Sequence, residues 1–158
     1  MSDASGTQPA LPALGFAEDL TEEERTALSA YGEFITANDG DVIIQEGHEQ
    51  DSLFLIVFGT FHVQTETTGR PVLLGQLKSG DTIGEVNIFD SGSASASVVG
   101  RSLSQVWKID RARLEGFLES HPNAAARLLV SIATQLSRRL RRANEKAAMA
   151  REAVMDSF

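Results

Sequence analysis

The stretch that decides the fold of this chain is Ile83-Gly84-Glu85-Val86-Asn87-Ile88-Phe89-Asp90-Ser91-Gly92-Ser93-Ala94-Ser95-Ala96-Ser97-Val98. It opens like a strand and passes through a Gly-Glu pair into a short apolar helical turn. A loop rich in serine and glycine follows, and another strand begins at its end. The stretch therefore predicts a short helix and a polar loop held between two strands.

The surrounding region, from about residue 33 to 110, has the pattern of short β-strands. Residues 53–58 form an uninterrupted apolar run, as in a buried strand, and residues 61–66 alternate apolar with polar, as in a half-buried one. Glycines recur between these runs at the spacing of turns in a small antiparallel barrel or sandwich. We expect an α+β domain built on an eight-stranded antiparallel β-barrel of the double-stranded β-helix or jelly-roll type.

Helical patterns flank the strands on both sides. Thr21 and Glu24 have the spacing of a capping box before a helix of roughly residues 22–31. Asp110 can cap a second helix, and a long helix of about residues 123–154 follows without internal glycine or proline. Apolar positions in this long helix alternate steps of four and three, which predicts a heptad seam at Leu129, Ala133, Leu136, Leu140, Ala143, Ala147, Ala150 and Val154.

These patterns divide the chain into three parts. Residues 1–15 are rich in small residues and proline, which predicts a flexible leader. Residues 16–120 form the barrel domain, with an N-terminal helix and a short helix in the stretch quoted first. Residues 121–158 contain the long C-terminal helix, whose seam predicts a dimerisation element.

The composition narrows the class of protein. The net charge of -8 disfavours a general affinity for nucleic acid, and the absence of cysteine excludes thiolate chemistry and disulfides. No secretory signal is visible and the apolar runs are too short to cross a bilayer, so we expect a cytoplasmic protein that does not bind membranes. The three histidines lack the spacing of metal ligands, and we expect neither a metal site nor an enzyme.

Several blocks of the chain resemble the cyclic nucleotide-binding domain family, which includes the catabolite activator and the regulatory subunits of protein kinase A. Gly84-Glu85 resembles the signature of the family's phosphate-binding cassette, and residues 138–146 resemble the dimer helix of the catabolite activator. Three further blocks occur in the family's order, at residues 41–47, 53–59 and 106–111. The resemblance covers about residues 16–150, and it is to a stand-alone bacterial-type member without a DNA-binding domain.

This resemblance implies a binding site and its chemistry. Glu85 would accept a hydrogen bond from the ribose 2′-hydroxyl, and Gly84 would let the backbone approach the ligand closely. Backbone N–H groups and serine hydroxyls of the loop would hold the cyclic phosphate of cAMP or cGMP. The candidate ligand-binding residues are Gly84, Glu85, Val86, Ser93, Ala94, Ser95, Ala96, Ser97 and Asn144.

The chain departs from the family at the phosphate. The family's arginine should fall at Ala94 or Ser95, and neither residue is basic. Loss of a charge-assisted hydrogen bond of about 1.5–3 kcal/mol should weaken binding by about tenfold to a hundredfold. Arg70 or Arg101 could replace it, or the three serine hydroxyls and the loop amides could hold an anion without a cation.

The long helix departs from the family as well. The positions that meet the adenine correspond to Ala143 and Asn144, of which only Asn144 can form a hydrogen bond to a base edge. Without a ligand, Glu85 would cap backbone N–H groups and keep the loop folded. The site is therefore altered at its phosphate end and at its base end.

The arginines at positions 138, 139, 141 and 142 lie beside the heptad seam, as solvated or partner-pairing residues do, so they do not predict DNA binding. The seam favours a homodimer, and the alternative is a monomer whose helix folds back over the barrel. We expect a non-catalytic regulatory module whose cassette binds cyclic nucleotide weakly or not at all and which acts through an unidentified protein partner. The alternative is a genuine sensor of cAMP, cGMP or another small anion.

Overall fold

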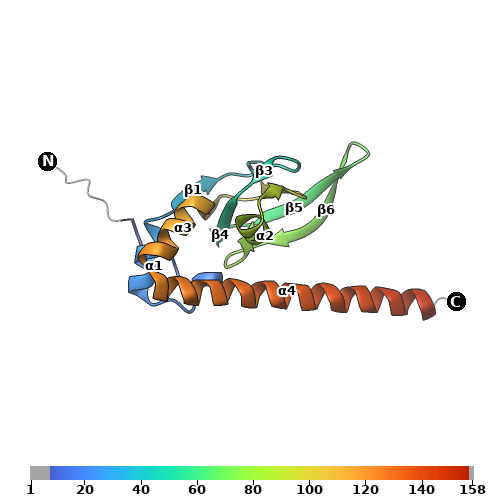
Figure 1. Cartoon of the computed structure of the whole chain (residues 1–158). Coiled ribbons are helices and arrows are strands. Elements are labelled where there is room, and N and C mark those ends of the chain that lie inside the picture. The colour runs from blue at the N-terminus through green and yellow to red at the C-terminus, as the bar shows by residue number, and fades with distance from the viewer. Residues whose placement is uncertain (1–7, 157–158) are drawn as a thin grey trace.

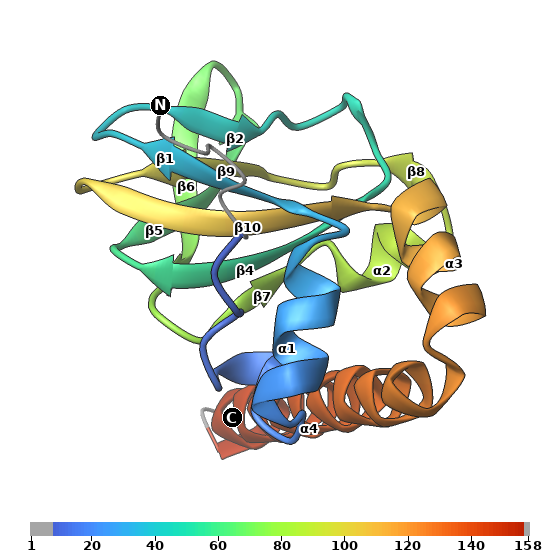
Figure 2. The same ribbon diagram turned by 90° about the vertical axis from the view of Figure 1, so that its left-hand side faces the viewer.

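The computed structural model describes residues 8–156, and its core is a pair of β-sheets with helices gathered at one end (Figures 1 and 2). The first sheet has the strand order β1-β10-β4-β7 and the second has the order β2-β9-β5-β6. The strands of the first sheet are β1 (Glu33–Ala37), β10 (Ser104–Asp110), β4 (Ser52–Phe58) and β7 (Thr82–Ile83). Those of the second are β2 (Val42–Ile44), β9 (Ser97–Gly100), β5 (Phe61–Thr67) and β6 (Arg70–Leu77).

A third sheet holds only two short strands, β3 (Glu49–Gln50) and β8 (Gly92–Ser93). All pairings between the described strands are antiparallel. The expected α+β class is therefore confirmed, but the closed eight-stranded barrel is wrong. Residues 8–156 form ten strands in three separate sheets, with β1 and β7 as edges of the first and β2 and β6 as edges of the second.

Short strands explain part of the difference between the predicted barrel and the observed sheets. A strand of two residues, such as β3 or β8, has no alternating pattern that a sequence can display, so the sequence does not predict it as a separate strand. Register shifts within the β4–β10, β2–β9 and β5–β6 pairings bend the strands locally.

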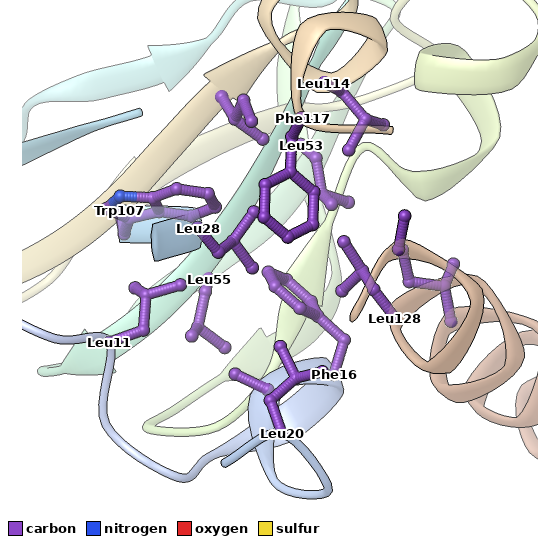
Figure 3. Close-up of a cluster of buried hydrophobic side chains, with 14 of the residues drawn as sticks. Leu11, Phe16, Leu20, Leu28, Leu53, Leu55, Trp107, Leu114, Phe117 and Leu128 are labelled. Atoms are coloured by element: carbon purple, nitrogen blue, oxygen red, sulfur yellow. The ribbon is translucent and has the colours of Figure 1, made fainter. Parts of the chain in front are cut away.

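Two apolar clusters form the interior. One lies between the two large sheets and includes Phe54, Phe61 and Val106, from strands β4, β5 and β10. The other lies beneath the helices and surrounds Trp107, Phe16 and Phe117, all of which are fully buried (Figure 3). The indole N–H of Trp107 donates to the carbonyl of Ser29, so the buried polar end of this side chain is satisfied.

The described part of the predicted leader is packed against the domain. Leu11 is fully buried in the helical cluster, and the amide of Gln8 donates to the carbonyls of Ser29 and Gly32. A 3-10 turn, η1 (Gly15–Ala17), adds the buried side chain of Phe16. The prediction of a flexible segment is thus corrected for residues 8–15, while residues 1–7 lie outside the described residues. Apolar side chains separated by prolines packed into the core although they formed no periodic pattern.

The helices around this cluster begin as the sequence predicts. Helix α1 (Glu22–Ser29) has the expected capping box, in which Thr21 and Glu24 exchange hydrogen bonds through their side chains. The Asp110 carboxylate accepts from the backbone N–H of Arg113 and caps α3 (Arg111–Ser120). Arg127 of the next helix pairs with Glu24, which ties α1 to that helix and lowers the pKa of Glu24.

The long helix α4 (Pro122–Asp156) runs along one side of the sheets (Figure 1). It starts one residue before the predicted bound, because proline is well accommodated in the first turn of a helix. Its first part is packed on the core through Ala124, Ala125, Leu128 and Ile132, whereas every residue from 137 to 156 is exposed. None of the helices within the described residues is long and apolar enough to cross a membrane.

Candidate functional site

The stretch quoted first lines a cavity of about 390 Å³ between the sheets and α4. The short helix α2 (Glu85–Phe89) and the loop that follows it form one side, and strands of both large sheets form the other. The lining residues are Ile44, Gln50, Val63, Leu77, Thr82, Ile83, Gly84, Glu85, Val86, Asn87, Ser93, Ala94, Ser95, Ala96, Val98 and Arg139. A cavity of this size lies in the range of small-molecule sites, which is about 300–1,000 Å³.

Gly84 sets the position of α2 beside strand β4. Its φ of +86° lies in the left-handed region, and a Cβ atom at this position would lie 2.1 Å from the carbonyl oxygen of Ser52. The amide of Gln50 donates to the same carbonyl at 2.9 Å. Behind α2, Ile88 is fully packed into the helical cluster. Only glycine fits between α2 and β4. The close approach of another group to the backbone of Gly84, which was expected from a ligand, is therefore made by strand β4.

Glu85 is the buried charge of the cavity, with 8% of its side chain exposed. Its Oε1 atom pairs with Nη1 of Arg139, a residue of α4, and Arg139 also donates to the carbonyl oxygen of Thr82. Among the side chains of residues 8–156, Arg139 is the one that pairs with the Glu85 carboxylate. Arg139 therefore neutralises the carboxylate within the cavity.

A second contact between the same elements supports this ion pair. The Thr82 hydroxyl donates to the side-chain carbonyl of Gln135 at 3.1 Å, one helical turn before Arg139. Partial burial lowers the pKa of Arg139 from its usual value, and the carboxylate of Asp81 opposes this shift. The guanidinium thus pairs with Glu85 and is also attracted by Asp81, and 42% of its own side chain remains exposed.

The loop after α2 is anchored through the backbone of Ala94. The backbone N–H of Ala94 donates to the His48 carbonyl, and the Ala94 carbonyl accepts from Gly47. In contrast, the backbone N–H groups of Ser95 and Ala96 make no hydrogen bond within the described part of the chain. These two residues line the cavity, so their N–H groups are available to an acceptor atom.

Most of the predicted site residues come together here. Seven of the nine candidates line the cavity: Gly84, Glu85, Val86, Ser93, Ala94, Ser95 and Ala96. Ser97 does not, because its hydroxyl accepts from the backbone N–H of Glu46 outside the cavity. Asn144 is exposed on α4 and is not among the lining residues of this chain. Period-two alternation along β9 explains the first difference, since Ser97 and Val98 point to opposite faces of the sheet.

The structure also corrects the expectations about cations. Arg70 and Arg101 do not line the cavity, and Arg101 instead donates to His62 Nδ1 at 3.2 Å. Arg139, which the sequence analysis placed among the solvated flanks of the seam, is the cation that does line it. A signal for this was present in the sequence: positions 128, 132, 135 and 139 follow steps of three and four along one helix face. That face continues from the core to the cavity.

The remaining lining is apolar or neutral. Ile44, Val63, Leu77, Ile83 and Val98 contribute aliphatic side chains from both large sheets. Gln50 and Asn87 add uncharged amides. Within residues 8–156 no cluster of three or more histidine, cysteine or acidic residues is suited to hold a metal ion. The arrangement is suited to a ligand with a flat apolar part and a few polar groups.

Comparison with known proteins places this geometry in a family. A CRP-like cAMP-activated global transcriptional regulator of Mycobacterium tuberculosis is 30% identical over 110 residues, which are 69% of this chain and 47% of that protein. The cAMP-activated global transcriptional regulator CRP of Salmonella typhimurium is 28% identical over 106 residues, or 66% of this chain and 49% of the relative. The chain thus spans about half the length of these curated relatives.

Among solved structures, the N-terminal domain of a transcriptional regulator from Streptomyces coelicolor superimposes with a TM-score of 0.71 and 25% identity. The match covers 86% of this chain and 95% of that domain. The family model of the cyclic nucleotide-binding domain matches residues 34–121, which include α2, its loop and all of the strands except the first residue of β1. The chain therefore belongs to the cyclic nucleotide-binding domain family.

Proposed function

We propose that this chain is a non-catalytic regulatory module that binds cyclic nucleotides weakly or not at all and acts through contact with other protein chains. The observation that carries the proposal is the ion pair between Glu85 and Arg139. This ion pair neutralises Arg139, the one cationic side chain of the lining, and the loop of residues 91–97 contains no other cation. The relatives named above are regulators, which supports the regulatory part of the proposal.

The electrostatic argument concerns the phosphate of a cyclic nucleotide. This group carries a full negative charge, and burying it without a counter-charge is costly. Glu85 and Arg139 cancel within the cavity, and Asp81 adds negative charge beside Arg139. The free N–H groups of Ser95 and Ala96 offset only part of the cost, because a hydrogen bond contributes about 0.5–1.5 kcal/mol net.

The first prediction follows from this balance. We expect cAMP and cGMP to bind with dissociation constants well above 10 μM, about tenfold to a hundredfold weaker than a cassette with its own arginine would give. Isothermal titration calorimetry with the purified chain measures both constants. A dissociation constant of a few micromolar or tighter for either nucleotide contradicts the proposal.

A second candidate function is that of a genuine sensor of a small anion. It is favoured by the size of the cavity and by the unpaired N–H groups of Ser95 and Ala96. Ligand binding to the folded state raises the melting temperature, and a hundredfold excess over the dissociation constant stabilises by about 2.7 kcal/mol. A melting temperature unmoved by millimolar cyclic nucleotides counts against this candidate.

Self-association through α4 is a further part of the proposal. The exposed half of the helix carries the seam positions Leu140, Ala147 and Val154, and no described residue of the same chain covers them. Apolar side chains at heptad spacing are buried when two such helices pair. We therefore propose a homodimer formed by this helix, with the β-sheet domain of residues 16–120 as the regulatory unit.

The seam offers a matched pair of substitutions. Ala147→Glu places a carboxylate at the close approach of the two helices and is expected to raise the dimer dissociation constant at least tenfold. Ala148→Glu makes the same chemical change one position off the seam and is expected to leave the constant within about twofold. Sedimentation equilibrium measures both. Equal effects of the two substitutions, or a monomeric wild-type chain, would show that the seam does not form the interface.

A further inference from the structure

We propose that a second copy of this chain docks into an acidic groove beside the first half of α4 and inserts the basic part of its own α4 there. This contact goes beyond the function proposed above. It uses a different face of α4 from the heptad seam, and it does not involve the cavity beside α2.

The groove lies between α1 and the first half of α4, where Arg127 pairs with Glu24 (Figure 2). It consists of two cavities of about 500 and 360 Å³. Asn123, in the first turn of α4, lines both cavities and so joins them. A groove of this size can receive several side chains of another helix.

The charged groups of the groove are mostly acidic. Asp19 lines the larger cavity and Glu23 the smaller one, and neither forms an ion pair within residues 8–156. Glu24 also lines the groove, but Arg127 neutralises it. Three carboxylates and one guanidinium leave the groove with a net negative charge, which favours a cationic occupant.

Two further side chains of the larger cavity have unmet interactions. Val130 is 66% exposed, although it is apolar. Ser131 is only 9% exposed, and its hydroxyl makes no hydrogen bond within the described part of the chain. An arginine side chain suits both, because its aliphatic stem covers apolar surface and its guanidinium carries five N–H donors.

The chain contains a segment with this chemistry, in the second half of α4. Arg138, Arg141, Arg142 and Lys146 are exposed, and none of them forms an ion pair within residues 8–156. Helix α4 is continuous from residue 122 to residue 156, so this segment cannot fold back into the groove of its own chain. The α4 helix of a second copy can bring these cations to the groove.

Helical spacing places the groove and two of these arginines on one stripe of α4. Positions 123, 127, 130, 134, 138 and 141 follow steps of three and four, so their side chains share one face. At about 100° per residue, this stripe lies about 130° around the helix from the seam positions. The two contacts therefore use different faces of α4, and both can exist in one assembly.

A two-fold axis satisfies the groove and the arginines of both copies at once. We place the two α4 helices antiparallel, with Val130 of each copy opposite Thr134 of the other. The partner's Arg138 then lies opposite Ala126, which lines the groove together with Asp19. By symmetry, Arg138 of the first copy lies in the groove of the partner.

Charge reversal tests this contact in the Ala147→Glu variant, in which the seam is expected to be broken. Sedimentation equilibrium of this parent is expected to show a dimer at about 50 mM salt, with a dissociation constant at least tenfold higher at about 500 mM. Asp19→Lys or Arg138→Glu alone is expected to weaken the dimer at least tenfold at the lower salt concentration. The reason is that two-fold symmetry converts two attractive contacts into two repulsive ones.

The double variant and a control make the test specific. Asp19→Lys combined with Arg138→Glu restores opposite charges, and the dissociation constant is expected to return to within about threefold of the parent. Asp39→Lys makes the same charge change at an exposed turn residue outside the groove, and we expect a change of less than about twofold.

The outcomes separate this contact from the proposed function. A parent that stays monomeric at both salt concentrations overturns the contact and leaves the weak-binding regulatory module and its seam intact. Single variants that behave like Asp39→Lys overturn the pairing of Asp19 with Arg138. A double variant that stays as weak as the single ones overturns it as well.

Discussion

Replacing Gly84 with alanine is expected to lower the free energy of unfolding by about 2–5 kcal/mol. The φ of +86° alone costs a residue with a Cβ atom about 1–2 kcal/mol. The new Cβ atom would also lie 2.1 Å from the backbone oxygen of Ser52, and backbone atoms cannot rotate away as a flexible side chain does. Relieving this contact displaces α2 from β4, at a further cost of about 1–3 kcal/mol. Urea unfolding measures the change as a shift of the midpoint.

Gly69→Ala is the matched control for this variant. Gly69 also has a positive φ, +78°, but a Cβ atom there meets nothing within 4 Å. The control therefore isolates the backbone strain, and we expect it to cost only about 1–2 kcal/mol. Equal losses in the two variants would show that the contact between Gly84 and β4 contributes nothing to stability.

Ser95→Arg is expected to tighten cAMP binding by about tenfold to a hundredfold. Ser95 is exposed and lines the cavity, so a guanidinium at this position can reach a bound phosphate without displacing core atoms. Glu85 does not neutralise the charge of the new guanidinium, because Glu85 already pairs with Arg139. Calorimetric titration of the variant with cAMP measures the gain.

Two related variants control this experiment. Ser91→Arg adds the same charge to the same loop outside the lining, and its cAMP affinity should stay within about twofold of wild type. Ala94→Arg is expected to destabilise the protein, because Ala94 is 6% exposed and packs in the cluster between the sheets. If Ser95→Arg gains no affinity while remaining folded, the missing cation is not what limits cyclic nucleotide binding.

Local signals predicted much of the fold. The capping box at Thr21 and Glu24, the Asp110 cap and the short helix after Gly84 depend on neighbouring residues, and each appears as predicted. The sheets were less predictable, because two-residue strands such as β7 carry no periodic pattern. Their pairing is decided by partners far along the chain, as when Thr82 pairs with Leu55.

The candidate site was also predicted only in part. The Gly84-Glu85 pair and the loop of residues 93–96 were predicted because the binding elements are contiguous in sequence. Arg139 was predicted to be a solvated residue beside the seam, whereas it lines the cavity. The reason is that 54 positions separate it from Glu85, and no local sequence pattern shows which part of the fold a helix contacts. Ser95 and Ala94 were equivalent candidates in the sequence, and only burial distinguishes them.

The sequence by itself determined the resemblance to the family, the order of the helices around a β-rich region, and the lack of a basic residue within the loop. These properties depend on residue types and short spacings, which a linear chain displays directly. Only the tertiary structure decided that the guanidinium of Arg139, from α4, reaches Glu85 and that the two charges neutralise each other. The physical reason is that electrostatic balance depends on distance in space, and packing of α4 on the core brings together charges that the chain keeps far apart.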